Sequence, residues 1–434
     1  MVTRATVPAE PPLSHSLRTS SPRVRDWEHT VEKRAGKEAK MAQLQTDVAI
    51  VGAGPAGLML AHLLHNAGIE SVVIDNRSRD DIAHTHRAGI LEAGSVRMLE
   101  SAGVESRVHT DGHRHDGIDI RVNGASNHFD FPELVGESVW LYPQNEIFVD
   151  LSAARERTGR PTYYSVTDTR LGDVETERPW VTATTEGGDE LRIDARYVVG
   201  ADGSRGPCRA MIPENTRQRF FHEYPFAWFG ILCEAPPSHE VLIYSSSERG
   251  FALISQRSDT VQRMYFQTSP GTDVADWSDD RIWTELQSRV AGPDGFELKT
   301  GPILDKTVLP FRSAVTEPMQ HGSLFLAGDS AHTVPPTGAK GLNLAFADVA
   351  VLAPALISAL KDSDAEALAG YSQTATKRVW KAQNFSYQMT RMLHTDPTQD
   401  AFETKRSLGE LRSILESDHG RRYLAECYTG WPHG

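Results

Sequence analysis

Three short motifs that contain glycine lie far apart in the chain, and two of them also contain aspartate. They are GAGPAG at residues 52–57, GADG at residues 200–203 and GD at residues 328–329. Each follows a run of apolar residues, so each is expected at the end of a strand. Glycines let a backbone approach a phosphate closely, and carboxylates accept hydrogen bonds from sugar hydroxyls. Together the motifs indicate one nucleotide site that the chain visits three times.

The first motif stands in a complete strand–turn–helix–strand pattern. A β-branched run at residues 47–51 precedes it, and an apolar, helix-like segment that ends near Gly68 follows it. The next apolar run, residues 71–74, ends in Asp75. A carboxylate in that position accepts hydrogen bonds from the hydroxyls of an adenosine ribose. The sequence therefore predicts a Rossmann-like dinucleotide-binding unit.

The glycines of this motif are expected to have separate roles. Gly52 makes the tight turn, Gly54 lets the backbone approach a pyrophosphate, and Gly57 allows the helix to pack closely on the strand. The helix that begins after them offers unpaired N–H groups and partial positive charge to the phosphates.

The later motifs favour FAD over NAD as the bound dinucleotide. A flavin is long, and its ribityl chain needs polar partners far from the adenosine end. Asp202 and Asp329 supply carboxylates in the second and third motifs. Asp329 would otherwise cap the helix expected from Leu342 onward, but a proline turn at residues 335–338 intervenes. Because only one GxGxxG motif occurs, a nicotinamide co-substrate would dock transiently near the flavin.

Composition argues against several classes of protein. The net charge of −13 over 434 residues argues against nucleic-acid binding, which needs a basic surface. The three cysteines have no pairing or metal-ligand pattern, which is typical of a reducing cytoplasm and indicates no metal site. No stretch approaches the roughly 18 apolar residues of a membrane helix. Residues 1–40 lack the apolar region of a signal peptide, so we expect a cytoplasmic protein without a membrane partner.

The three motifs together resemble those of the single-component FAD-dependent aromatic hydroxylases. The resemblance extends from about residue 45 to residue 432 and includes several further runs. These runs are YPF at 224–226, RGFAL at 249–253, SQRS at 255–258, EPMQHG at 317–322 and KGLN at 340–343. Matching runs spread over several elements are far more specific than a glycine motif alone.

The resemblance implies a pocket for an aromatic carboxylate. Arg257 matches the residue that pairs with the substrate carboxylate, and a planar guanidinium can hold such a group by two parallel hydrogen bonds. Ser255 and Tyr265 would add hydrogen bonds. Pro336 matches the residue whose carbonyl oxygen faces the substrate phenol.

The resemblance also implies a path for the phenol proton. Tyr244 and Tyr428 match two tyrosines that connect to the phenol, and His115 matches the far end of the relay. A free phenol titrates near pH 10, about the value for tyrosine, so its ionisation near neutrality needs help. Histidine titrates in the useful range, and these three residues are the expected catalytic groups.

Five further residues are implied to contact the flavin. Arg87 and Gln144 match phosphate and ring-side contacts. Arg263 matches a cation beside the reduced flavin, and Leu342 and Asn343 match contacts near its pyrimidine edge.

The resemblance implies a complete reaction. NADPH or NADH reduces FAD, and the reduced flavin takes up O2 to form a C4a-hydroperoxide. Its distal oxygen attacks 4-hydroxybenzoate ortho to the phenol and gives 3,4-dihydroxybenzoate. The expected partners are therefore a small aromatic carboxylate, NAD(P)H and O2.

Three alternatives to this reaction stay open on the sequence. One is a related flavin hydroxylase that acts on another aromatic acid, such as an aminobenzoate. Another is a flavin oxidase or dehydrogenase with the same fold. The third is a non-catalytic FAD-binding scaffold, which would have no reason to keep an arginine beside two phenols. The choice between NADPH and NADH is also open, because residues 76–81 place two arginines beside two aspartates.

The expected fold class is α/β, with a Rossmann-like FAD-binding domain, a substrate-covering β-sheet domain and a C-terminal helical region. Residues 1–43 are expected to form a disordered extension. The FAD-binding domain is expected at 44–218, with 320–345 returning to it. The sheet domain is expected at 219–319 and the helical region at 346–434. Relatives of this class are commonly homodimers, so a homodimer is one possible assembly, which the residues themselves do not demonstrate.

Overall fold

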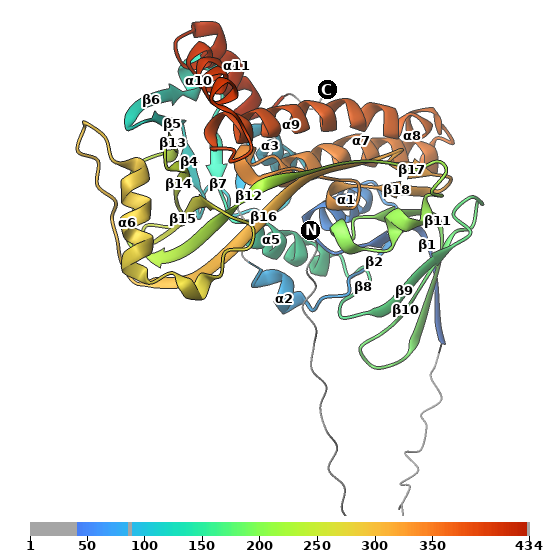
Figure 1. Cartoon of the computed structure of the whole chain (residues 1–434). Coiled ribbons are helices and arrows are strands. Elements are labelled where there is room, and N and C mark those ends of the chain that lie inside the picture. The colour runs from blue at the N-terminus through green and yellow to red at the C-terminus, as the bar shows by residue number, and fades with distance from the viewer. Residues whose placement is uncertain (1–40, 86–88, 432–434) are drawn as a thin grey trace, which may run out of the picture. The chain divides into compact units, whose positions relative to one another are not determined.

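The computed structural model describes residues 41–85 and 89–431 (Figure 1). The described residues fall within one compact unit. Most of the predicted extension, residues 1–40, lies outside the described residues, as does Arg87. The first strand, β1 (Met41–Val51), begins slightly before the expected boundary at residue 44. The predicted division into domains stays a prediction.

The first sheet brings the three glycine motifs to one edge. Within the described residues its strand order is β17-β18-β11-β1-β2-β8. The strands β18, β11, β1 and β2 are parallel neighbours, and Gly200 pairs with both Val51 and Leu326. Since parallel strands end at the same edge, the motifs that follow β1, β11 and β18 lie side by side. The strands are β17 (Gln320–His321), β18 (Leu324–Leu326), β11 (Glu190–Gly200), β2 (Ser71–Ile74) and β8 (Thr162–Tyr163), with β9 (Thr167–Gly172) and β10 (Trp180–Thr184) joined through β11.

Helices cover this sheet because its strands are apolar on both faces. All four residues of β2 are buried. The helix α1 (Pro55–Asn66) contacts both α5 (Gln144–Arg157) and α7 (Gly341–Lys361). The short helices α2 (Arg79–Ala83) and α3 (Ala93–Ser101) follow β2 and β3.

One expectation about apolar segments was wrong. The helix α7 is long and apolar enough to cross a membrane by length and composition. However, 67% of its most apolar window is buried inside the fold. Figure 1 shows α7 running beside α9 (Tyr371–Leu393), and the two helices are in contact. Its apolar character is that of a core helix that packs on several sides.

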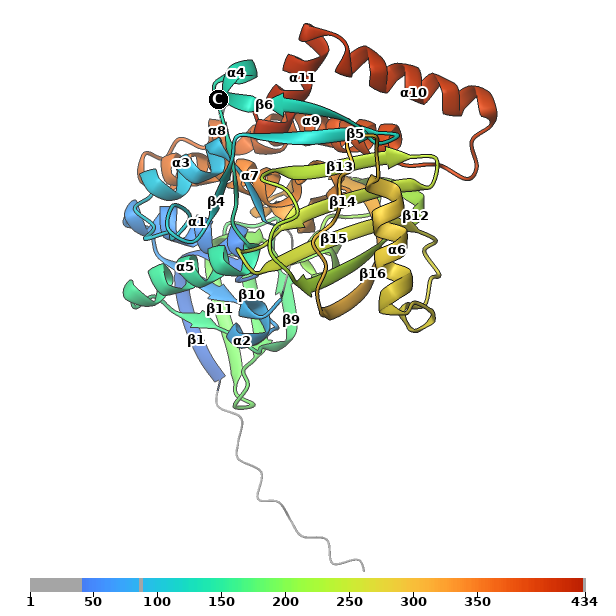
Figure 2. The ribbon, with the colours of Figure 1, turned by 90° about the vertical axis from the view of Figure 1, so that its left-hand side faces the viewer.

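The second sheet separates its two faces by the alternation of side chains. Its order in the described residues is β19-β16-β12-β15-β14-β13-β5-β6. Ile243, Ile254 and Met264 face α6 (Asp279–Val290), which lies across the strands (Figure 2). Because successive side chains alternate, Tyr244 and Tyr265 face the opposite side. The strands are β5 (Gly117–Val122), β6 (Ala125–Asp130), β12 (Gln218–Glu234), β13 (Leu242–Ser247), β14 (Gly250–Gln256), β15 (Val261–Thr268), β16 (Ile303–Glu317) and β19 (His332–Thr333).

The remaining elements close the second apolar cluster. A small antiparallel sheet has the order β3-β7-β4, and α9 and α11 add Phe385 and Tyr428 to the cluster that contains Tyr244. The elements are β3 (Ile90–Glu92), β4 (His113–His115), β7 (Val139–Leu141), α4 (Phe131–Val135), α8 (Glu366–Ala369), α10 (Ala401–Leu415) and α11 (Asp418–Thr429). The predicted α/β class with a C-terminal helical region is confirmed.

Candidate functional site

The turn after β1 requires glycine at two positions. Gly52 has φ +114°, and a Cβ there would lie 2.1 Å from the carbonyl oxygen of Ala201. A Cβ on Gly57 would lie 1.9 Å from the carbonyl oxygen of Gly52. These distances are far below contact, so both glycines allow the turn, the strand and the helix to pack.

Gly54 has a different environment. A Cβ there would meet no atom within 4 Å. Gly54 caps α1 without any side-chain hydrogen bond, and Pro55 begins the helix. The space in front of this turn and the unpaired N–H groups of the helix suit the phosphates of a dinucleotide. Gly54 is therefore free of a packing role in the protein itself.

Asp75 lies against the glycine turn. Its carboxylate accepts hydrogen bonds from the backbone N–H groups of Ala53, at 2.8 Å, and Arg77, at 2.9 Å. The residue is 6% exposed. A carboxylate fixed in this way at the end of β2 is preorganised to accept hydrogen bonds from hydroxyl groups of a ribose.

Asp202 and Asp329 stand at the ends of the two neighbouring strands. One oxygen of Asp202 accepts a hydrogen bond from the N–H of Cys208 at 2.8 Å, while Oδ1 is buried without a partner among the described residues. Burial raises the pKa of Asp202. Asp329 lies on the 3-10 turn Gly328–Ser330 rather than at the cap of α7, which begins at Gly341. The alternative role of Asp329 as a helix cap is thus excluded.

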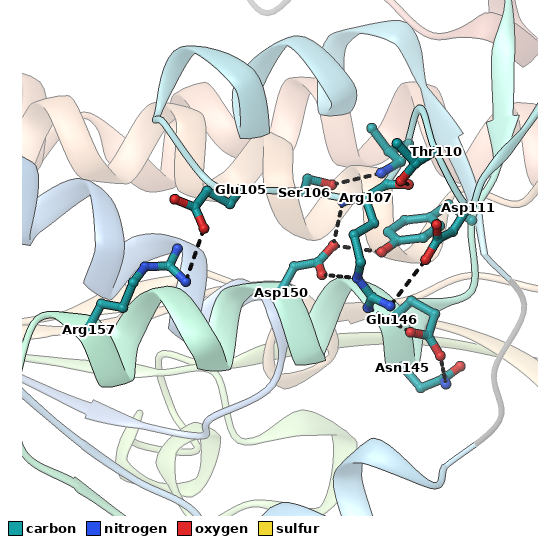
Figure 3. Close-up of polar contacts among 11 residues, drawn as sticks. Glu105, Ser106, Arg107, Thr110, Asp111, Asn145, Glu146, Asp150 and Arg157 are labelled. Atoms are coloured by element: carbon teal, nitrogen blue, oxygen red, sulfur yellow. Dashed lines mark hydrogen bonds and ion pairs between the residues drawn. The ribbon is translucent and has the colours of Figure 1, made fainter.

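The first turn of α5 carries Gln144, and a network of ion pairs holds that turn. Arg107 binds Asp150 at 2.8 Å and Glu146 at 2.7 Å, both on α5 (Figure 3). The hydroxyl of Tyr142 donates to Asp150 at 2.6 Å. Asp150 is 5% exposed, and a buried carboxylate destabilises the fold unless it is paired, so these contacts stabilise it. The network fixes the start of α5 beside the segment that follows α3.

Asn343 is fully engaged by the protein. Its side-chain oxygen accepts from the N–H of Glu92 and the hydroxyl of Ser95, at 2.9 and 2.8 Å. Its amide donates to the carbonyl of Ile90 at 2.8 Å and to that of Ala339. A flavin contact from Asn343 would therefore come from its backbone. Leu342 is half-buried, and both residues lie in the first turn of α7, where N–H groups lack helical partners.

Sheet geometry places the expected substrate residues on one face. Ser255 on β14 pairs with Arg263 on β15, and Leu253 pairs with Tyr265. Alternation then directs Ser255, Arg263 and Tyr265 to the same side as Tyr244. Arg257 follows β14 in the same alternation, and its N–H donates to the carbonyl of Val261 at 2.7 Å.

Arg257 differs from its neighbour Arg263 in its partners. Arg263 donates to the hydroxyl of Tyr265 at 3.2 Å and reaches Asp305 at 3.4 Å. Within residues 41–85 and 89–431, no ion pair joins Arg257 to a carboxylate. Burial lowers the pKa of Arg257, and the positive charge of Arg263 also disfavours its charged form. A desolvated guanidinium without an acidic partner is a strong site for a ligand carboxylate.

The two tyrosines of the predicted relay are in direct contact. The hydroxyls of Tyr244 and Tyr428 are 2.8 Å apart, and both residues are buried. Burial raises the pKa of each phenol, so both are neutral near pH 7. A pair of neutral hydroxyls can pass a proton by exchanging donor and acceptor roles.

His115 is not connected to this pair. Neither ring nitrogen has a hydrogen-bond partner among the described residues. The residue pairs with Val139 in the small sheet, and Val139 belongs to the same apolar cluster as Tyr244 and Tyr428. Burial lowers the pKa of His115 to about 4, so the ring is neutral near pH 7. The structure thus brings two of the three relay residues together and leaves the third nearby without a hydrogen bond to them.

Pro336 begins the short 3-10 turn Pro336–Gly338 ahead of α7. Its carbonyl oxygen accepts from the N–H of Ala339 at 2.9 Å, which leaves one lone pair for another donor. The turn is packed against α9, since Thr390 donates to Thr337 at 2.9 Å.

Sequence reasoning missed three buried charged residues around the site. Lys340 donates to Glu92 at 2.6 Å and to the carbonyl of Tyr428 at 3.0 Å. Asp348 accepts from the N–H of Gly328 at 2.8 Å. The sequence contained a signal for Asp348, which is a carboxylate in the middle of an apolar helix. Such a carboxylate is rarely buried without a partner, so a specific contact could have been predicted.

The residues present fit FAD. Gly54 leaves space at the phosphate-binding turn, Asp75 is fixed at the ribose position, and Asp202 has a buried oxygen without a partner. Asp329 follows β18 at this edge of the sheet, and the turn that carries it contacts α7. No group of metal-ligating side chains is found in the part of the chain that the structure describes.

Comparison with known proteins shows the family of the chain. The family model described as "FAD binding domain" matches residues 45–386. The chain is 44% identical over 394 residues to p-hydroxybenzoate hydroxylase from Acinetobacter baylyi, covering 91% of this chain and 97% of that protein. It is 27% identical to 6-methylpretetramide 4-monooxygenase from Streptomyces rimosus, covering 84% and 88%. The chain therefore belongs to the FAD-binding family of aromatic hydroxylases that includes p-hydroxybenzoate hydroxylase.

Solved structures show the same fold. The chain superposes on p-nitrophenol 4-monooxygenase PnpA from Pseudomonas putida with a TM-score of 0.73 at 18% identity, covering 90% of this chain and 99% of that one. PqsL from Pseudomonas aeruginosa in complex with 2-aminobenzoylacetate gives 0.68 at 20% identity, covering 84% and 100%. The predicted family and fold class are confirmed.

Proposed function

We propose that this chain is an FAD-dependent monooxygenase that hydroxylates 4-hydroxybenzoate at the 3-position. The observation that carries this proposal is the sheet face that directs Arg257, Tyr265 and Tyr244 to one side, where Tyr428 of α11 hydrogen-bonds to Tyr244. A carboxylate at one end and a phenol at the other are the two polar groups of 4-hydroxybenzoate. The 44% identity to p-hydroxybenzoate hydroxylase supports the same substrate.

FAD is the cofactor of the proposed reaction, and NAD(P)H and O2 are its co-substrates. When bound, FAD takes reducing equivalents from NAD(P)H and uses O2 to deliver one oxygen atom to the aromatic ring. Gly54, Asp75, Asp202, Asp329 and the start of α7 would hold it. Arg263 would supply positive charge near the substrate pocket, because it lies on the same face as Ser255.

Arg257 orients the substrate in this proposal. Its guanidinium holds the carboxylate, with the hydroxyls of Tyr265 and Ser255 as further donors. Ser255 currently donates weakly to the carbonyl of Gln256 at 3.2 Å, so its hydroxyl can turn to a ligand. Charge-assisted hydrogen bonds in a buried pocket favour one substrate orientation strongly.

Tyr244 and Tyr428 would then remove the phenol proton. Oxygen transfer to a ring is easier when the ring is electron-rich, so the phenol should be deprotonated at that moment. The Tyr244–Tyr428 pair passes the proton onward. His115 is neutral near pH 7 and can accept it if a water molecule or a small movement joins it to the pair.

The experiment that tests this function uses purified protein with FAD. NADH and NADPH oxidation is followed with 4-hydroxybenzoate, with 4-aminobenzoate and without substrate, and products are identified by mass. The proposal expects oxidation stimulated by 4-hydroxybenzoate and 3,4-dihydroxybenzoate as product. Preferential turnover of 4-aminobenzoate would instead favour the related hydroxylase of another aromatic acid.

We propose that the phosphates of NAD(P)H bind in a cavity lined by arginines. It has a volume of about 350 Å³ and is lined by Arg209, Arg217 and Arg219, with Glu214 as its one acidic residue. Arg77 and Arg79 face Asp75 at 3.7 Å and Glu156 at 3.0 Å, and Arg217 faces Glu214 at 3.8 Å. Arg219, in contrast, has no ion pair to a carboxylate among the described residues. Replacing Arg219 with Gln should raise the KM for the nicotinamide and leave 4-hydroxybenzoate affinity unchanged. Equal KM values in both proteins would exclude this position.

We also propose that the enzyme is a cytoplasmic homodimer. Phe220, Phe221 and Trp380 are exposed apolar residues, and the rings of Phe220 and Trp380 are in edge-to-face contact. An exposed aromatic patch of this kind suits a self-association surface. Light scattering of the purified chain should give twice the monomer mass, and a monomer mass would contradict the proposal.

A further inference from the structure

One buried carboxylate holds both sides of the turn that carries Asp329. Oδ2 of Asp348 accepts the N–H of Gly328 at 2.8 Å and lies 2.6 Å from Nε2 of His332. Gly328 precedes Asp329 and His332 follows it by three positions. Asp348 is 1% exposed and His332 is 2% exposed. The turn is thus closed around Asp329 by a pair of side chains that solvent does not reach.

The same carboxylate joins two parts of the expected flavin site. Asp348 lies on α7, two turns after the residues Gly341–Asn343 at the start of that helix. Any shift of α7 relative to the turn at Gly328 would break the contacts of Asp348. The backbone of Gly328 also requires glycine, with φ +66° and a Cβ position 3.1 Å from Cβ of Ala345 on α7. Both the close packing at Gly328 and the hydrogen bonds of Asp348 therefore fix the position of the turn relative to α7.

The surroundings of His332 favour its charged form. Burial alone would lower the pKa of His332, but the carboxylate of Asp348 and the nearby charge of Asp329 raise that pKa on balance. Arg378 and Tyr371, both on α9, are the other titratable groups that interact with Asp348. A charged His332 would balance the carboxylate of Asp348 inside the fold.

We propose that Asp348 and His332 are positioning residues: they fix Asp329 and the start of α7 relative to each other, in the arrangement that binds FAD. Neither residue needs to touch the cofactor. Their effect is to hold the turn and the helix in a single arrangement, so that the cofactor meets a preorganised site. This inference rests on the proposed role of Asp329 in FAD binding.

The test is FAD affinity of reconstituted apoprotein, measured by quenching of flavin fluorescence. Asp348→Asn keeps an acceptor for the N–H of Gly328 but removes the charge, and His332→Gln keeps a donor without the charge. Each should raise the FAD dissociation constant about 10-fold, the size of one charge-assisted hydrogen bond. His332→Gln covers the case in which Asp348→Asn does not fold.

A matched control separates positioning from general stability. Arg121 and Asp294 form another pair with a buried arginine, at 2.8 Å, in the second sheet. Asp294→Asn should lower the melting temperature while the FAD dissociation constant stays at its parental value. A similar loss of FAD affinity in Asp294→Asn would show that loss of any ion pair to a buried arginine has this effect, and it would overturn the proposal.

The pH profile provides a readout that mere packing would not change. In the parental protein, FAD affinity should fall as pH rises through the raised pKa of His332, because the charged ring is then lost. His332→Gln should show low affinity with no such step. A step of equal size in both proteins would overturn the proposal.

Asp329→Asn distinguishes this inference from the proposed function. If Asp329→Asn weakens FAD binding while Asp348→Asn and His332→Gln do not, the positioning role is wrong and the flavin site stands. If none of the three variants weakens FAD binding, the role of Asp329 itself is wrong, and the positioning role falls with it.

Discussion

At the scale of single residues, the candidate chemistry depends on which polar groups lack partners. Arg257 has no carboxylate partner among the described residues, while most other buried arginines are engaged. Arg121 binds Asp294, and Arg289 binds Glu285 at 2.8 Å. Arg257 is half-buried, and a partly desolvated cation that the protein leaves without an acidic partner is costly unless a ligand completes it. This difference is what marks Arg257 as a binding residue.

Replacing Arg257 with Ala should therefore weaken the binding of 4-hydroxybenzoate. The loss of a charge-assisted, two-pronged contact should raise the dissociation constant by about 10- to 100-fold. A titration of flavin fluorescence measures this constant directly. Arg249→Ala is the matched control, because Arg249 is an exposed arginine of the same sheet that binds Glu285. Equal affinities in Arg257→Ala and the parental enzyme would exclude the assigned role.

Replacing Tyr244 with Phe should slow hydroxylation. The change removes one hydroxyl of the 2.8 Å contact with Tyr428 and keeps the ring. A lost proton-transfer group typically costs about 100-fold or more in the step it serves. The ratio of product formed to NAD(P)H oxidised should fall, because oxidation continues without hydroxylation. The control is Tyr423→Phe on α11, where the tyrosine is 47% exposed, and coupling in Tyr244→Phe equal to this control would count against the relay.

At the scale of elements, the sequence predicts structure at a strand end only where the interacting residues are neighbours in the chain. The turn after β1 was predictable, because its glycines, its strand and its helix are neighbours in sequence. The motifs after β1, β11 and β18 suggested that these strands are neighbours. In the structure, β11 pairs in parallel with both β1 and β18, which brings the three motifs to one edge. The link from Asp348 to the turn at Gly328 was not predictable, since it depends on how α7 packs against a strand end.

The two glycines of the first motif should respond differently to alanine. Gly57→Ala places a Cβ against a backbone oxygen, and overpacking of this kind should destabilise the protein by about 1–3 kcal/mol. Gly54→Ala meets open space, so the apoprotein should keep its melting temperature. FAD affinity should nevertheless fall in Gly54→Ala, because the new methyl group occupies the approach of the phosphates.

Thermal unfolding of both apoproteins and FAD titration of both variants check this pair of outcomes. A Gly54→Ala variant that binds FAD as tightly as the parental protein would show that the open space at Gly54 is not used by the cofactor. A Gly57→Ala variant with an unchanged melting temperature would show that the turn can relax.

At the scale of the whole molecule, the sequence predicted the fold class well and the long-range contacts poorly. Strand-like runs at 240–245 and 264–268 are visible in the sequence, and they overlap the observed strands Leu242–Ser247 and Val261–Thr268, which place Tyr244 and Tyr265 on one face. The expectation about membrane-length segments was wrong for α7, because an apolar core helix and a membrane helix share the same composition. His115 was assigned to the relay by resemblance, but a hydrogen bond depends on exact tertiary placement, and none is present among the described residues.

Two buried histidines should make the protein sensitive to acid. Burial lowers the pKa of His115 to about 4 and that of His394 to about 3. An unfolded histidine titrates near 6.5, so between this value and the folded pKa the unfolded chain binds protons that the folded chain does not. Stability is therefore complete above pH 6.5 and falls as pH decreases toward 4. For His115 alone the loss should reach about 3 kcal/mol.

Urea unfolding at several pH values checks this prediction. His115→Asn removes one titrating group, so its free energy of unfolding should fall less steeply between pH 6.5 and pH 4 than that of the parental protein. Identical slopes for the two proteins would show that His115 gains a proton in the folded state as easily as in the unfolded one.

In the proposed reaction, the enzyme transfers one atom of O2 to 4-hydroxybenzoate. The most direct measurement is a reaction of the FAD-loaded enzyme with NAD(P)H and 4-hydroxybenzoate under ¹⁸O2, with the product analysed by mass. We expect 3,4-dihydroxybenzoate that carries one ¹⁸O atom at its new hydroxyl. Oxidation of NAD(P)H that yields only labelled hydrogen peroxide, with 4-hydroxybenzoate unchanged, would contradict this expectation.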